Sequence, residues 1–198
     1  MAAVTSTAYW QDRYIAGGHS GAGSYGKFAE FKAEVLNDFV ASRGITSVIE
    51  FGCGDGNQLS LAEYPAYLGF DVSEKAIAMC RRKFAGDSTK DFQPLAEYAG
   101  DKAELALSLD IVYHLIEDDA FGRHMRVLFA AAQRFVIIYS SNFDESTQHP
   151  CVKHRKFTDW IERNAPGWKL LAHIPNRYPW QGDENNGCDA DFFIYEPA

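Results

Sequence analysis

The strongest constraint on the fold is a glycine-rich turn that follows a short apolar run. Ser47-Val-Ile-Glu-Phe51 predicts a buried strand, and the next residues, Gly52-Cys-Gly-Asp-Gly56, place glycines at alternate positions. Glycine has no Cβ, so the backbone can turn tightly and a ligand can touch the main chain. A helical segment is expected from about Gln58. This order predicts a ligand site at the carboxyl end of a parallel sheet.

Strand and helix patterns alternate through most of the remaining sequence. The pattern predicts strands over 66–71, 90–92, 105–109 and 134–139, and helices over 26–42, 73–84 with Ser73 as N-cap, and 118–132. Strands alternating with helices are typical of a doubly wound sheet.

The C-terminal third departs from this alternation. Thr158 is expected to cap a short helix, and Trp168–Ile174 and Asp191–Glu196 predict two strands without a helix between them. Such a pair favours an antiparallel hairpin, because a parallel pair needs a crossover. The predicted fold is a single α/β domain with a Rossmann-like, seven-stranded sheet, mostly parallel with an antiparallel C-terminal hairpin.

Length, charge and cysteine spacing limit the function classes. The 198 residues suit one domain, and the formal net charge of −8 disfavours long nucleic acid as a partner. The N-terminus shows no signal-peptide pattern and no apolar stretch is long enough to span a bilayer, so no membrane insertion is expected. Cys53, Cys80, Cys151 and Cys188 lie far apart and predict neither a disulfide framework nor a zinc site. A cytoplasmic location is expected from this usage.

Two carboxylates distinguish the glycine turn from a dinucleotide site. The dinucleotide fingerprint is G-x-G-x-x-G, whereas Gly52, Gly54 and Gly56 give G-x-G-x-G with Glu50 in front. A carboxylate beside a pyrophosphate would be repulsive, but beside a cationic cofactor it is favourable. Asp71, at the end of the second strand, is placed to accept hydrogen bonds from two ribose hydroxyls.

The sequence resembles class I S-adenosylmethionine-dependent methyltransferases. The matching segments are Val48–Gly56, Gly69-Phe-Asp-Val-Ser73, Leu107-Ser-Leu-Asp-Ile-Val-Tyr-His-Leu115 and the late hairpin. The resemblance implies S-adenosylmethionine as cofactor, with the glycines around its methionine part, Glu50 near its ammonium, Asp71 on the ribose and Val72 on adenine. The predicted cofactor residues are Trp10, Arg13, Glu50, Gly52, Cys53, Gly54, Gln58, Asp71, Val72, Ser108 and Leu109. The residue at the adenine edge after the third strand is not identifiable.

The segment after the fourth predicted strand is where methyl transfer is expected. His114 suits general-base work and Tyr113 can orient an acceptor, with a structural histidine as the alternative. Asp110 and His114 also have a spacing seen in metal-dependent small-RNA methyltransferases, but Tyr113 stands where those enzymes carry a glutamate. Two remaining ligands are too few for a divalent site, so no metal is expected.

A basic loop follows the fifth predicted strand. The segment 149–156 contains two histidines and three cations, a composition that suits a phosphate or carboxylate on the acceptor, with a solvated turn as the alternative. The predicted acceptor-binding residues are Tyr14, Tyr25, Asn142, His149, His154 and Arg155.

Residues 1–25 precede the predicted methyltransferase domain of residues 26–198. The segment from Tyr9 to Tyr25 is rich in glycine and serine and carries Trp10 and Arg13, so it predicts an irregular, partly mobile lid or a packed arm. It also resembles, with the C-terminal tail, small methyltransferases of bacterial surface-glycan loci.

The predicted activity is methyl transfer to a small hydroxylated or phosphorylated acceptor that is anionic, with a saccharide or glycan end as one candidate. The alternatives are a protein or RNA methyltransferase, disfavoured by the acidity, or a non-catalytic S-adenosylmethionine-binding subunit. The sequence leaves the oligomeric state open.

Overall fold

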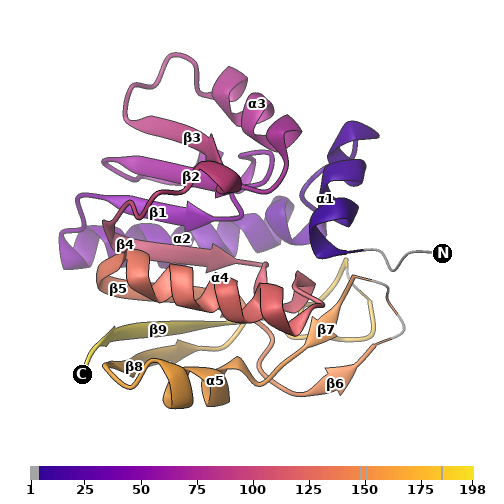
Figure 1. The fold of residues 1–198 in the computed structure, drawn as a ribbon, viewed down its shortest axis with the longest axis vertical. Helices are drawn as coiled ribbons and strands as arrows, with labels where there is room; N and C mark the ends of the chain where they lie inside the picture. The colour runs from indigo at the N-terminus through magenta and orange to yellow at the C-terminus, as the bar shows by residue number, and fades with distance from the viewer. Residues whose placement is uncertain (1–4, 148, 150, 184) are drawn as a thin grey trace.

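The computed structural model describes residues 5–147, 149, 151–183 and 185–198, and a seven-stranded sheet forms its centre (Figure 1). The strand order is β3-β2-β1-β4-β5-β9-β8. The strands are β1 Val48–Phe51, β2 Tyr67–Asp71, β3 Lys90–Pro94, β4 Ala103–Leu109, β5 Ala132–Ser140, β8 Trp168–Ile174 and β9 Asp191–Pro197. β1 to β5 pair in parallel, while β9 is antiparallel to both β5 and β8. The predicted sheet with its antiparallel C-terminal hairpin is confirmed.

Helices cover both faces of the sheet, which makes the fold doubly wound. α2 (Gly26–Arg43) and α3 (Glu74–Lys83) pack on one face, and α4 (Asp118–Ala131) and α5 (Phe157–Asn164) pack on the other. Successive side chains of a strand point to opposite faces, so β5 serves both cores. Its residues Phe135, Ile137 and Tyr139 join the α2 side, while Val136 and Ile138 join the α4 side.

The N-terminal segment is more regular than expected. α1 spans Ser6–Ile15, and the 3-10 turn η1 spans Ala22–Ser24. The Thr5 side chain accepts a hydrogen bond from the Ala8 amide at 3.2 Å and so caps α1. The prediction of an irregular segment over Tyr9–Tyr25 is therefore wrong for Tyr9–Ile15. Residues 1–4 of the predicted arm lie outside the described residues.

Two other expected elements differ from the sequence prediction. The helix predicted after Gln58 is only the 3-10 turn η2, Gln58–Leu61, because Tyr64 and the start of β2 follow within a few residues. Thr158 is not an N-cap: α5 begins at Phe157, and the Thr158 Oγ1 accepts a hydrogen bond from Asn142 Nδ2 at 3.1 Å.

Other predicted ends are confirmed. The Ser73 Oγ accepts from the Ala76 amide at 3.3 Å at the start of α3, and Gly44 ends α2 in the left-handed conformation. A small two-stranded sheet beyond β5, β6 (Glu145–Ser146) with β7 (Lys153–His154), had no sequence signal. None of the helices in the described part of the chain combines the length and apolar character needed to cross a bilayer.

Candidate functional site

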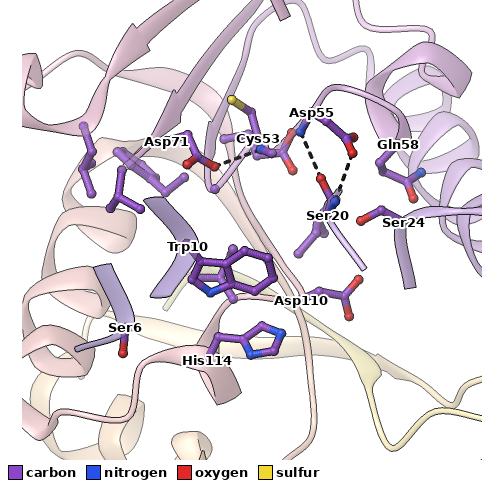
Figure 2. Close-up of a pocket in the computed structure, with 18 of the residues that line it drawn as sticks. Ser6, Trp10, Ser20, Ser24, Cys53, Asp55, Gln58, Asp71, Asp110 and His114 are labelled. Atoms are coloured by element: carbon purple, nitrogen blue, oxygen red, sulfur yellow. Dashed lines mark hydrogen bonds between the residues drawn. The ribbon is translucent and has the colours of Figure 1, made fainter. Parts of the chain in front are cut away.

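A pocket opens where β1, β2 and β4 end, with α1 lying across it (Figure 2). The strand order reverses between β1 and β4, so this is the point at which doubly wound sheets bind ligands. The empty space, including the part open to solvent, is about 880 Å³. The wall includes Trp10, Tyr14, Lys32, Glu50, Gly52, Cys53, Gly54, Gln58, Asp71, Val72, Leu95, Leu109, Asp110, His114 and His124.

The glycine turn after β1 forms one side of this pocket, and its shape requires glycine. Gly52 and Gly54 have φ values of 102° and 58°, a region that other residues rarely adopt. A Cβ on Gly54 would lie 2.4 Å from Ser20 Oγ, and one on Gly52 would lie 2.2 Å from Ile111 Cδ1. The turn is therefore pressed against both the N-terminal arm and the loop after β4.

The amide groups of this turn are bonded within the protein. Gly52 and Cys53 both donate to the Phe70 carbonyl, at 2.7 and 3.0 Å. Gly54 donates to Asp71 Oδ2 at 3.0 Å, and Asp55 donates to Ser20 Oγ at 2.9 Å. The helix whose N-terminus would hold a pyrophosphate is reduced to η2. The turn has neither the donors nor the helix dipole of a phosphate cradle.

Asp71 ends β2 beside the turn. Its two oxygens accept one amide bond each, from Gly54 at 3.0 Å and from Ser73 at 2.8 Å. A carboxylate has about four lone-pair positions, so Asp71 keeps acceptor capacity toward the pocket. Burial raises the pKa of Asp71 to about 6, and the bonds from Ser73 and Gly54 oppose this rise.

Glu50 lies in β1 and is also buried in the pocket wall. Its Oε2 accepts a hydrogen bond from the Tyr67 hydroxyl at 2.5 Å. Burial raises the pKa of Glu50 to about 7, although the Tyr67 hydroxyl and the Lys32 ammonium oppose the rise. A cation in the pocket would relieve this cost, because it favours the charged carboxylate.

Gln58 contributes an unused acceptor. Its Nε2 donates to the Ala29 carbonyl at 3.1 Å, whereas its Oε1 is buried without a partner among the described residues. Gln58 and Glu50 both line the pocket, so two side-chain acceptors there suit an ammonium group. The predicted cofactor residues Glu50, Gly52, Gly54, Gln58 and Asp71 thus share one pocket.

Lys32 and Asp110 line the same pocket and were not among the predicted site residues. The Lys32 ammonium pairs with Asp110 Oδ2, and Lys32 is only 1% exposed. The sequence carries one signal that Lys32 is buried, because Lys32 falls on the same face of its helix as Phe28 and Phe31.

Tyr113, which was predicted to orient the acceptor, does not line the pocket. Its hydroxyl donates to Asp110 Oδ1 at 2.8 Å.

His114 lies in the pocket wall, edge-on to Trp10 with ring centroids 4.9 Å apart (Figure 2). Its Nδ1 is 2.9 Å from the Cys151 carbonyl oxygen, which can only accept, so Nδ1 carries a proton. Removal from water lowers the pKa of His114. The ring is therefore neutral near pH 7, with a lone pair on Nε2.

The N-terminal arm is joined to the pocket rim at three places. Ser6 donates from its amide and its hydroxyl to Glu117, at 3.0 and 2.5 Å. Gln11 Nε2 donates to the Val72 carbonyl at 3.2 Å. Ser20 donates its amide to Asp55 Oδ2 at 3.0 Å, and the Tyr14 hydroxyl is 2.8 Å from Ser20 Oγ. Trp10 and Tyr14 thereby line the pocket.

Three predicted ligand residues point elsewhere. Arg13 Nε donates to the His19 carbonyl at 2.7 Å, and Arg13 is not part of the pocket wall. The Tyr25 hydroxyl donates to Asp55 Oδ2 at 2.7 Å, so Tyr25 supports the glycine turn. Ser108 is fully buried and bonds His124 Nε2 at 2.8 Å, so that His124, not Ser108, faces the pocket.

The cations Lys153 and Arg155 of the basic loop after β5 bond to other parts of the protein. Arg155 donates to the Leu115 and Ile116 carbonyls, at 2.5 and 3.0 Å, and to Asp118 Oδ1 at 2.8 Å. Lys153 also pairs with Asp118, at 2.6 Å. The expectation of an acceptor anion at Arg155 has no support in this geometry, because the guanidinium is taken by the loop before α4.

Three more of the predicted acceptor residues, Asn142, His149 and His154, also lie outside the pocket at β1, β2 and β4. Asn142 pairs with Thr158 at the start of α5. His154 Nδ1 is 2.7 Å from Ser141 Oγ, and its ring stacks on Phe143 with centroids 4.6 Å apart. His149 is exposed, with Nδ1 3.2 Å from Cys151 Sγ.

Solved structures with the same architecture are S-adenosylmethionine-dependent methyltransferases. The magnesium protoporphyrin IX methyltransferase of Synechocystis PCC 6803, solved with bound S-adenosylmethionine, matches with a TM-score of 0.70 and 15% identity over 100% of both chains. The N-methyltransferase NodS of Bradyrhizobium japonicum WM9, in complex with S-adenosylhomocysteine, matches with a TM-score of 0.72 and 12% identity, covering 97% of this chain and 98% of that chain. The fold is that of class I methyltransferases. No protein-family model and no curated protein sequence matches the chain.

The methyltransferase fold does not determine the acceptor. The small RNA methyltransferase HEN1 also matches, with a TM-score of 0.61 and 18% identity, covering 88% of this chain and 26% of that chain. One of these proteins is named for a porphyrin acceptor and another for small RNA, so the acceptor of this chain must be argued from its own site.

Proposed function

We propose that this chain binds S-adenosylmethionine in the pocket at β1, β2 and β4 and transfers its methyl group to a small acceptor. The observation that carries the proposal is the chemistry of the pocket wall. Glu50, Asp71 and the free Gln58 Oε1 are acceptors, and the amides of the glycine turn are already bonded. Such a wall favours a cationic, ribose-bearing cofactor over a pyrophosphate.

Each part of the cofactor has residues that fit it. Glu50 and Gln58 would hold the ammonium, Asp71 would accept from the ribose hydroxyls, and Val72 and Leu95 would pack on adenine. Leu95, which follows β3, would then lie at the adenine edge, a position for which the sequence offered no candidate. S-adenosylmethionine supplies a methyl carbon bonded to a cationic sulfur, which is electrophilic without a metal.

His114 would serve as general base for a hydroxyl or amine acceptor. The Cys151 carbonyl fixes the proton on Nδ1, so Nε2 could take the acceptor proton while the methyl group passes to the acceptor and S-adenosylhomocysteine is the leaving group. When His114 takes the proton its ring becomes positively charged. The negative charge of Asp110 favours this charged form, because it raises the pKa of His114. Trp10 and α1 would exclude water from this step.

For the acceptor, we propose a small molecule such as a hydroxylated saccharide or glycan end. The resemblance of the arm and tail to methyltransferases of surface-glycan loci supports it, as does the net charge of −8, which disfavours RNA. An RNA acceptor would instead give turnover that falls steeply with added salt.

Calorimetric titration with S-adenosylhomocysteine and, separately, with NAD tests the cofactor. We expect S-adenosylhomocysteine to bind and NAD to give no heat of binding. Tighter binding of NAD would overturn the proposal. An acceptor screen that follows S-adenosylhomocysteine release would then separate an enzyme from a cofactor-binding subunit.

A further inference from the structure

A buried ion pair joins α2 to the loop after β4. The Lys32 ammonium pairs with Asp110 Oδ2 and lies 5.2 Å from the ring centroid of Tyr139. Both partners are nearly inaccessible, with 1% exposure at Lys32 and 9% at Asp110. Removing one partner of such a pair leaves an uncompensated buried charge, which is strongly unfavourable.

Asp110 is held from three directions in a strained backbone conformation. Its φ of 58° is the one positive value among the described non-glycine residues. Its amide donates to the Tyr139 carbonyl at 2.9 Å, and its Oδ1 accepts from the Tyr113 hydroxyl at 2.8 Å. Strain of this kind persists where the surroundings fix it, and it concentrates at functional sites.

Lys32 also acts on Glu50, which faces the same pocket. The groups that influence Glu50 come from several elements: Lys32 on α2, Tyr67 and Asp71 on β2, Asp110 after β4, Cys53 in the glycine turn, and Tyr64 before β2. Lys32 is the cation of this set and lowers the pKa of Glu50, whereas Asp71 and Asp110 raise it. One lysine thus compensates two carboxylates of the same pocket wall.

We propose that Lys32 is a positioning residue of the methyl-transfer site, which holds Asp110 in the pocket wall and compensates the negative charges of Asp110 and Glu50. The inference rests on the proposed function, since Glu50 would meet the cofactor ammonium and Asp110 would support the base His114. Neither role requires Lys32 to touch cofactor or acceptor.

The test compares three variants across a pH range: Lys32→Met, Asp110→Asn and the double variant. An exposed lysine on α3, replaced as Lys75→Met, is the control. The dissociation constant of S-adenosylhomocysteine is measured by calorimetry, and thermal unfolding without ligand is measured over the same pH range. Circular dichroism checks that each variant is folded.

Loss of the cation should raise the pH below which S-adenosylhomocysteine binding weakens by on the order of one unit. Loss of the anion in Asp110→Asn should move the same midpoint downward, and the double variant should return it toward wild type. The ligand-free stability profile should move in the same directions. Lys75→Met should leave both unchanged.

A purely structural role would weaken binding equally at every pH. Midpoints that coincide in all folded variants would therefore overturn the inference while leaving the proposed function standing. If Lys32→Met does not fold, the inference is still decided by Asp110→Asn and by the double variant. The double variant removes both charges together and so leaves no buried charge unpaired. If wild type binds no S-adenosylhomocysteine, the proposed function fails, and the ligand-free profiles still test the charge coupling.

Discussion

Replacing Glu50 by glutamine should make the ligand-free protein more stable while weakening cofactor binding. Glutamine keeps the acceptor for the Tyr67 hydroxyl but carries no charge at any pH. In the folded protein, burial raises the pKa of Glu50 from 4.5 to about 7. The folded state therefore holds the proton more tightly than the unfolded chain. The stability that protonated Glu50 contributes is fully present below its unfolded pKa of 4.5 and is lost as pH rises toward its folded pKa of about 7.

The size of this loss follows from the two pKa values. Linkage gives an upper limit for this cost of roughly 1 kcal/mol at about pH 5.5 and roughly 3 kcal/mol at about pH 8. The glutamine variant avoids this cost. For a chain of this size, a gain of about 3 kcal/mol corresponds to a rise in Tm of roughly 6–12 °C at about pH 8. The rise should be smaller at about pH 5.5.

Thermal unfolding of wild type and Glu50→Gln at both pH values measures this directly. The exposed Glu63 supplies a matched control, Glu63→Gln, which should leave Tm unchanged. Calorimetry on the same samples should show S-adenosylhomocysteine binding weakened by about 10- to 100-fold, the contribution of one hydrogen bond to a charged group. An equal or lower Tm for Glu50→Gln near about pH 8, or a difference that does not grow with pH, would refute the reasoning.

Other substitutions test the remaining parts of the site. Asp71→Ala should weaken S-adenosylhomocysteine binding by about 1.5–3 kcal/mol per lost ribose bond, as measured by calorimetry, and unchanged affinity would place the ribose elsewhere. His114→Gln should lower kcat by about 10²- to 10⁴-fold with cofactor affinity unchanged, and an unaltered kcat would leave His114 a structural residue. Arg155→Ala should lower Tm, because the Leu115 and Ile116 carbonyls lose a donor and Asp118 loses one of the two cations that pair with it. A normal Tm with a raised acceptor KM would instead restore the acceptor-anion interpretation. Ser6→Ala should speed hydrogen exchange across α1, since Ser6 anchors it to Glu117, and cofactor should slow exchange there in wild type.

The sequence-based predictions were wrong at places where segments far apart in the chain contact one another. The segment Tyr9–Ile15 reads as irregular beside its glycine-rich continuation, but it forms a helix because Ser6 and Gln11 find partners on the pocket rim. Arg155 belongs to a cationic cluster in the sequence, yet its guanidinium is bonded to the loop before α4. No local pattern reports either set of partners.

The sequence by itself determined the sheet, its hairpin and the first half of the site. The pattern of apolar residues indicates the buried strands, and the alternate glycines with Glu50 and Asp71 indicate the ligand-binding turn. Each of these signals lies within a short stretch of the sequence. Only the tertiary structure brought Lys32 to Asp110, aligned His114 with the Cys151 carbonyl and bonded every amide from Gly52 to Asp55 within the protein. The physical reason is that charge pairing and hydrogen-bond satisfaction depend on which segments fold against one another, 78 residues apart in the case of Lys32 and Asp110.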